Sequence, residues 1–71
     1  MLKNTESLDL QSLKARRSQL ENLIQTHQYA ANNYMQRGLD GLAQFESNEA
    51  SRYQVMLDRV QYRILSLLVR S

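Results

Sequence analysis

The chain contains no cysteine and no proline, and its only glycines are Gly38 and Gly41. Without cysteine it can form neither a disulfide nor a thiolate metal site, so nothing in it indicates an oxidising compartment. Without proline, the stretches on both sides of the two glycines are free to be helical. These absences predict an all-α chain with a single break.

Long hydrophobic runs are also missing. The densest run, from Ile64 to Val69, contains Ser66 and is far shorter than the roughly 20 residues that a membrane span requires. The opening from Met1 to Glu6 lacks the basic start and apolar core of a signal peptide. We therefore expect a cytoplasmic protein that does not enter a membrane.

The chain is short for a protein that folds alone. Its 71 residues form one small domain, and a core of that size rarely supplies more than about 3–5 kcal/mol without a staple. Nine Lys and Arg against seven Asp and Glu give a net charge of +2, with the two signs interspersed. Oligomerisation or docking on another protein is the remaining way to bury more surface.

The first helix is expected over residues 8–37, after a frayed segment at 1–7. Ser7 is a suitable N-cap, with Asn4 or Thr5 as alternatives, and Asp9 complements the helix dipole in the first turn. One row of inward side chains has heptad spacing, and Leu23 and Ala30 form a second row that Arg16 interrupts. The inward residues are Leu13, Leu20, Leu23, Ile24, His27, Ala30, Ala31 and Tyr34.

A tight turn is expected at residues 38–41. Gly38 suits the left-handed conformation that ends a helix in a Schellman motif, which would fold Leu39 back onto Tyr34. Asp40 is then placed to cap the next helix, and Gly41 helps the chain to reverse. Because short connections join antiparallel neighbours, the pattern predicts a helical hairpin.

The second helix is expected over residues 42–70. Polar residues in 43–51 leave two alternatives, a longer loop or a continuous helix, of which we favour the helix, with Leu42 and Phe45 facing inward. From residue 53 onward the inward stripe is well defined and includes Leu68. Its core residues are Tyr53, Met56, Leu57, Val60, Ile64 and Leu67. The predicted fold is an all-α, coiled-coil-like antiparallel hairpin, completed by a partner or by self-association.

The second helix also carries apolar residues that the hairpin does not require. A helix with one partner needs one apolar stripe, whereas a second set recurs here at helical spacing on another side. Arginine and tyrosine are enriched at protein interfaces. We therefore predict a partner-binding surface made of Val55, Tyr62, Leu65, Val69, Arg59 and Arg63.

The sequence offers little for catalysis or metal binding. His27 is the only histidine, and we expect it to form a hydrogen bond across the hairpin rather than to act as a pH switch. The carboxylates of Glu21, Glu46, Glu49 and Asp58 are scattered, without an evident partner base. No HxxxH or HExxH motif is present. A two-helix hairpin has no concavity for a reaction, so we predict no enzyme, catalytic residue, cofactor or metal.

Three arginines on one side of the second helix, Arg52, Arg59 and Arg63, raise the alternative of nucleic-acid binding. Phosphate binding requires a concentrated positive field. Here Glu49 and Asp58 interrupt the row, and no aromatic stacking platform accompanies it. We therefore favour arginines that are solvated or that face a protein partner.

The pair Tyr53–Gln54, followed by the apolar C-terminal half, resembles the small YscE/SsaE-type co-chaperones of bacterial type III secretion. In that family a similar pair opens the second helix of a short cytosolic hairpin. The resemblance implies a subunit that stabilises a tetratricopeptide-like chaperone and helps to keep the needle subunit monomeric. Two alternatives stay open: a self-associating hairpin that forms a dimeric four-helix bundle with a structural or regulatory role, and a small nucleic-acid-binding regulator.

Overall fold

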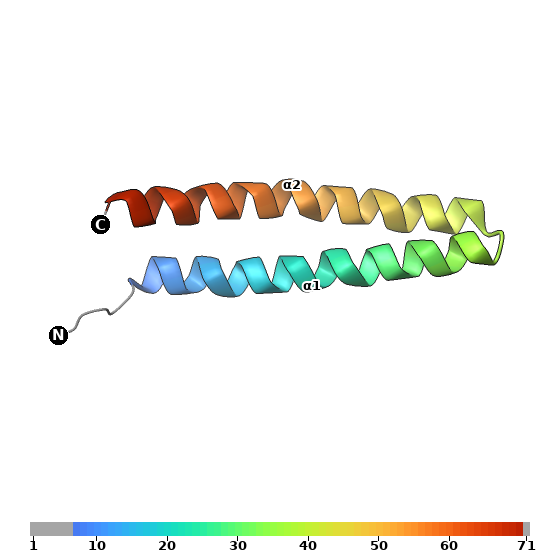
Figure 1. Cartoon of the computed structure of the whole chain (residues 1–71), viewed down its shortest axis with the longest axis horizontal. Coiled ribbons are helices and arrows are strands. Elements are labelled where there is room, and N and C mark those ends of the chain that lie inside the picture. Colours follow the sequence, from blue (N-terminus) through green and yellow to red (C-terminus); the bar gives the residue numbers. More distant parts are fainter. Residues whose placement is uncertain (1–6, 71) are drawn as a thin grey trace.

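The computed structural model describes residues 7–70 as two antiparallel helices, α1 (Leu8–Gln36) and α2 (Asp40–Arg70), joined by a short turn (Figure 1). The all-α hairpin predicted from the sequence is confirmed. The helix α2 is continuous, so the alternative of a loop within residues 43–51 is wrong. The predicted fraying concerns residues 1–7, of which 1–6 lie outside the described residues.

The N-cap and the first turn of α1 are formed by the residues that the sequence predicted. The hydroxyl oxygen of Ser7 accepts a hydrogen bond of 3.1 Å from the backbone N–H of Leu10. Asp9 lies in the first turn, where its carboxylate faces the positive end of the helix dipole. The predicted N-cap is confirmed.

The turn is a Schellman motif, as predicted, but it is shorter than residues 38–41. Gly38 has φ +76°, its N–H donates to the carbonyl of Met35 at 3.0 Å, and the N–H of Leu39 donates to that of Tyr34 at 2.9 Å. This motif alone reverses the chain, so α2 begins at Asp40 rather than after Gly41.

The roles predicted for Asp40 and Gly41 are therefore wrong. The carbonyl of Leu39 accepts the first hydrogen bond of α2, from the N–H of Ala43 at 3.0 Å. Leu39 is thus the residue before the helix, Asp40 belongs to its first turn, and Gly41 is an ordinary helical residue.

Each helix faces the other with two rows of side chains, spaced by seven residues, which together form the seam. Those of α1 are Leu10, Arg17, Ile24 and Ala31 in one row, and Leu13, Leu20, His27 and Tyr34 in the other. Those of α2 are Ala43, Ala50, Leu57 and Ile64, and Glu46, Tyr53, Val60 and Leu67. All of these residues are buried or half-buried, which is the pattern of an antiparallel coiled coil.

The second row of α1 differs from the predicted one. We expected Arg16, Leu23 and Ala30 to occupy it, but Arg16 is exposed while Arg17 is half-buried. Both candidate rows flank the row of Leu20, and α2 packs against the one that contains Ile24. Leu20, Ile24 and Leu57 form the centre of the core (the first of these is fully buried).

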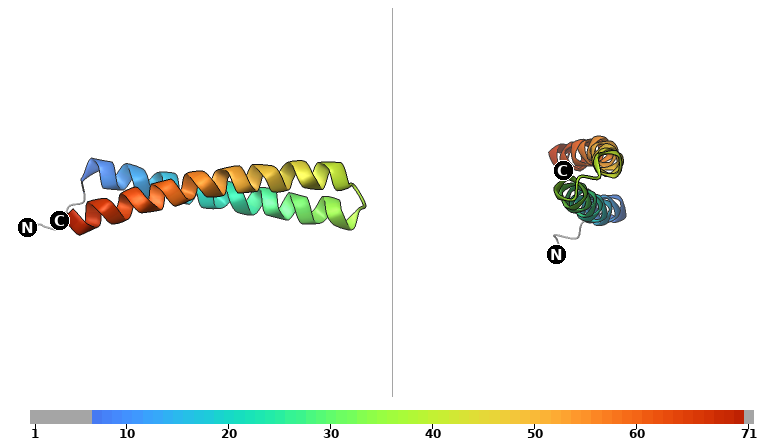
Figure 2. Two further views of the ribbon diagram at one scale, coloured as in Figure 1. Left: turned by 90° about the horizontal axis from the view of Figure 1, so that it is seen from above. Right: turned by 90° about the vertical axis from the view of Figure 1, so that its right-hand side faces the viewer.

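Figure 2 shows the consequence for the shape of the hairpin: the two helices cross near their middles, so that each changes sides between the turn and the open end. Sustained heptad spacing produces such winding, because a straight α-helix drifts relative to a seven-residue repeat. The molecule is long and thin, with extents of 56 × 17 × 13 Å. One helix can therefore cover only one side of the other.

Candidate protein-binding surface

The outward side of α2 carries a row of exposed apolar residues. Two of these residues lie midway in the sequence between two inward-facing ones: Val55 between Tyr53 and Leu57, and Tyr62 between Val60 and Ile64. Such a residue points directly away from α1, since two steps along a helix turn the chain by about 200°. The exposed fractions are 53% for Val55, 72% for Tyr62, 61% for Leu65 and 83% for Val69.

We call these four residues the outer row. Val55, Tyr62 and Val69 are spaced by seven, and Leu65 is three residues after Tyr62 and four before Val69. Tyr62, Leu65 and Val69 therefore adjoin on the helix surface, and Val55 lies on the same side two turns before Tyr62. Tyr62, Leu65, Ser66, Val69 and Arg70 also line an open depression on this side. The four residues predicted as a second apolar stripe therefore lie together on one surface.

The two predicted partner-facing arginines border the outer row. Arg59 is four residues after Val55 and three before Tyr62, so it adjoins both on the helix surface. Arg63 is four residues further along, and both arginines are exposed. Asp58 also adjoins Val55 and Tyr62, and its carboxylate accepts a hydrogen bond of 3.1 Å from the side-chain amide of Gln54.

The twelve residues predicted as the hairpin core all lie at the seam or beside it. Leu20, Ile24, Leu57 and Ile64 are buried, and the other eight are half-buried: Leu13, Leu23, His27, Tyr34, Tyr53, Met56, Val60 and Leu67. Sequence reasoning missed Leu10, Ala43 and Ala50, which are buried as well. Alanine gives a weak hydrophobic signal, and only its heptad spacing with Leu57 and Ile64 could have identified these two alanines.

Three residues expected to face inward are instead exposed. Leu42 is 50% and Phe45 58% exposed, because α2 approaches α1 through the small side chains of Ala43 and Ala50. Leu68 is 47% exposed and lines a shallow groove with Arg17, Gln61, Ile64 and Leu65. It therefore widens the apolar surface beside the outer row.

His27 forms the predicted hydrogen bond across the hairpin. Its Nδ1 lies 2.5 Å from Oε1 of Glu46, and its ring stacks on that of Tyr53 with centroids 5.6 Å apart. The expectation that Glu46 lacks a partner base is wrong, since the hairpin brings these two distant residues together. Both side chains are about one-fifth exposed, and the pair joins the helices within the seam.

Arg52 differs from the other arginines of α2 because it has a partner. Its guanidinium donates a hydrogen bond of 2.7 Å to Glu49 and lies 5.3 Å from the ring centroid of Tyr53. The hydrogen bond and charge of Glu49 raise the pKa of Arg52. Glu49, which we expected to be isolated, thus pairs with Arg52, the arginine that shares a side of α2 with Arg59 and Arg63.

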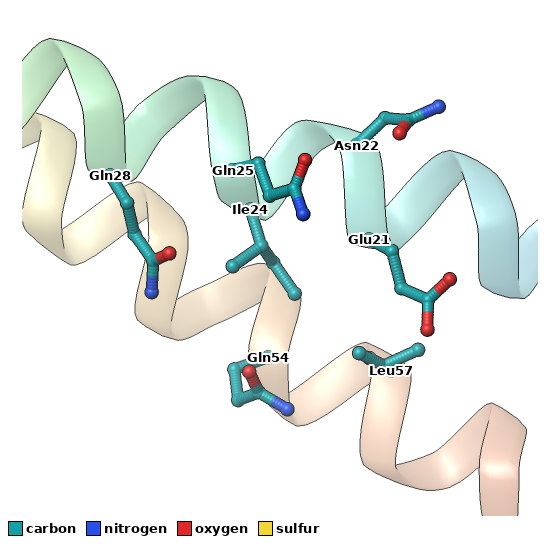
Figure 3. A pocket seen from close by; sticks show the side chains of 7 residues that line it. All are labelled: Glu21, Asn22, Ile24, Gln25, Gln28, Gln54 and Leu57. Atoms are coloured by element: carbon teal, nitrogen blue, oxygen red, sulfur yellow. The ribbon is translucent and has the colours of Figure 1, made fainter.

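One flank of the hairpin is rich in amides. Glu21, Asn22, Gln25, Gln28 and Gln54 surround the edges of Ile24 and Leu57 in an open depression (Figure 3). No pattern in the sequence predicted this depression. Its polar lining is what a solvated flank requires, and it contrasts with the apolar side chains of the outer row.

Residues 7–70 contain neither a candidate membrane span nor a candidate metal site. No helix within residues 7–70 is both long and apolar enough to cross a membrane. The same part of the chain contains no group of three or more His, Cys, Asp or Glu side chains able to hold a metal ion. No protein-family model matches the chain, and neither a curated protein nor a solved structure shows significant similarity to it.

Proposed function

We propose that this chain is a cytoplasmic, non-enzymatic protein-binding hairpin that docks on a larger protein through the outer row of α2. The observation that carries the proposal is the exposure of Val55, Tyr62, Leu65 and Val69 on the side opposite α1. Apolar residues that adjoin on one surface indicate an interaction site more strongly than scattered ones do. The hairpin core is complete without them.

The energetics support a specific role for this row. Burying an apolar side chain contributes roughly 1.5–3 kcal/mol, so these partly exposed residues supply roughly 4–8 kcal/mol together. Association costs of about 4–15 kcal/mol oppose that gain. The row alone therefore gives a weak complex, and polar contacts at its borders are needed for a tight one.

The specific role that we propose is that of a type III secretion co-chaperone, as the resemblance at Tyr53–Gln54 implies. In that role the hairpin stabilises a tetratricopeptide-like chaperone, and the complex keeps a needle-type subunit from polymerising. A narrow hairpin with a free apolar face suits such a subunit, because its own fold leaves that face to the partner. No catalytic step is required.

Co-expression with such a chaperone and its needle subunit from the same genome, followed by size-exclusion chromatography, tests this role. We expect the hairpin to co-elute with the chaperone and the needle subunit to stay monomeric. Val55→Glu and Tyr62→Glu should each abolish co-elution while circular dichroism shows unchanged helicity.

Tyr29→Glu is the matched control, because Tyr29 is 73% exposed on α1 and Tyr62 is 72% exposed on α2. The control should keep full binding. Binding that survives both substitutions in the outer row would overturn the proposal. A tight homodimer of the purified chain that ignores the chaperone would instead favour the self-associating four-helix bundle.

A further inference from the structure

Charge is unevenly distributed along the hairpin. The half near the open end, residues 8–20 and 55–70, contains six cations and two carboxylates, a net charge of +4. The half near the turn, residues 21–54, contains two cations and four carboxylates, a net charge of −2. The outer row lies wholly in the positive half, so a partner on this surface meets a positive field.

The arginines of α2 in this half are available to a partner. Arg59, Arg63 and Arg70 form no ion pair with a carboxylate of residues 7–70, whereas Glu49 engages Arg52 and Glu46 engages His27. The negative half thus pairs two of its carboxylates within the hairpin, whereas these three arginines of the positive half have no such carboxylate partner within residues 7–70.

The three arginines also lie on one side of the outer row. Arg63 follows Arg59 by four residues and precedes Arg70 by seven, so they form one border of the surface. The opposite border holds Gln54, Gln61 and Leu68, none of which is charged, while Asp58 lies within the row, three residues after Val55 and four before Tyr62. The surface is therefore a mainly apolar row with a cationic edge and an uncharged edge.

From this arrangement we infer the chemistry of the partner: an amphipathic helix whose apolar stripe packs on the outer row and whose carboxylates lie along the edge that faces Arg59 and Arg63. The inference rests on the proposed protein-binding function. The row spans 15 residues, about 21 Å of helix, and its three- and four-residue spacing is that of a helix-packing surface.

Two other classes of anionic partner fit the surface less well. Phosphate backbones and anionic lipid headgroups are recognised by a continuous cationic field. Here the carboxylate of Asp58 lies within the row, and the other four positions of the row are apolar. A helix accommodates both features, because it can place a neutral or basic residue opposite Asp58 and leucines opposite Tyr62 and Leu65.

Synthetic helices of 21 residues provide the probe. Two peptides share one leucine stripe and differ only in one edge, which is glutamate in the first and lysine in the second. Fluorescence anisotropy against the full chain should show that the glutamate peptide binds at least about tenfold more tightly at low salt. The preference should shrink as salt rises, because exposed charges are screened.

The charge-reversed double variant Arg59→Glu/Arg63→Glu should invert the preference, so that the lysine peptide binds more tightly. Arg59→Gln/Arg63→Gln should reduce the tenfold ratio to about one. Both sites are exposed, and unchanged circular dichroism shows that the hairpin stays folded in each variant. Tyr62→Glu should weaken both peptides alike.

Equal binding of the two peptides to the native chain would overturn the inference that the partner helix has an acidic edge. If neither peptide binds and the chain is instead retained on anionic vesicles or duplex DNA at physiological salt, the partner is a lipid surface or a nucleic acid and the inferred helix is wrong. These outcomes are separable from failure of the proposed function, which is decided by whether Val55→Glu and Tyr62→Glu lose the chaperone.

Discussion

Leu20 and Leu65 give the sharpest contrast between the two sides of the hairpin. Leu20 is fully buried at the centre of the core, whereas Leu65 on the outer row is 61% exposed. Truncating a buried leucine to alanine costs about 2–5 kcal/mol, through lost transfer free energy and the cavity left behind. The same truncation at an exposed site usually changes stability by about 0.5 kcal/mol or less.

The difference between the two truncations is large relative to the total free energy of unfolding of the hairpin. A core of this size rarely supplies more than about 3–5 kcal/mol, so Leu20→Ala should leave much of the chain unfolded without denaturant. Leu65→Ala should unfold almost as the native chain does. Urea unfolding followed by circular dichroism at 222 nm measures both, at several protein concentrations. A cost above about 1.5 kcal/mol for Leu65→Ala would refute the reasoning, because it would mean that the isolated chain already covers the outer row.

The other predictions concern the ends and the seam, and each is checked by the same urea titration. Gly38→Ala should lower the free energy of unfolding by about 1 kcal/mol, because Gly38 has φ +76°. Gly41→Ala should raise it by about 0.4–1 kcal/mol, since that residue is helical and an added Cβ would meet nothing within 4 Å. Two changes of the same sign would contradict the turn described. Ser7→Ala should lose about 1 kcal/mol and speed hydrogen exchange at the N–H of residue 10, and unchanged exchange would rule out the cap. Glu46→Ala should lose about 1 kcal/mol by leaving His27 without its partner, and no loss on substitution would mean that the pair does not stabilise the hairpin.

Local chemistry made the hairpin predictable from the sequence. The cap at Ser7 and the Schellman motif at Gly38 depend on residues that lie close together in the chain. The heptad spacing of Leu13, Leu20 and His27 predicted the side of α1 that faces its partner. Each of these signals can be recognised without knowledge of any distant contact.

The register of the seam could not be predicted in the same way. In α1, Leu23 and Ile24 flank the same central row, and only the packing of α2 decides which of them becomes buried. In α2, the larger apolar residues Leu42 and Phe45 suggested the inward side, but close approach through Ala43 turned them outward. The pairing of His27 with Glu46 follows from this register and was hidden for the same reason.

The candidate surface was partly predictable. Four apolar residues in excess of one stripe could be counted in the sequence, and the structure places them together on the outer side of α2. The segregation of charge became visible only once the antiparallel arrangement brought residues 8–20 beside residues 55–70. That Arg59, Arg63 and Arg70 have no carboxylate partner within residues 7–70 was recognisable only after the partners of Arg52 and His27 were known.

Backbone amide chemical shifts of the isotope-labelled chain, recorded as the chaperone or the glutamate-edged helix is added, test the central claim most directly. We predict that the changes concentrate at Val55, Arg59, Tyr62 and at residues 65–69, with Tyr29 on the opposite helix unaffected. Changes centred on the amide-rich flank of α1, or spread equally over both helices, would contradict the assignment of the outer row as the binding surface.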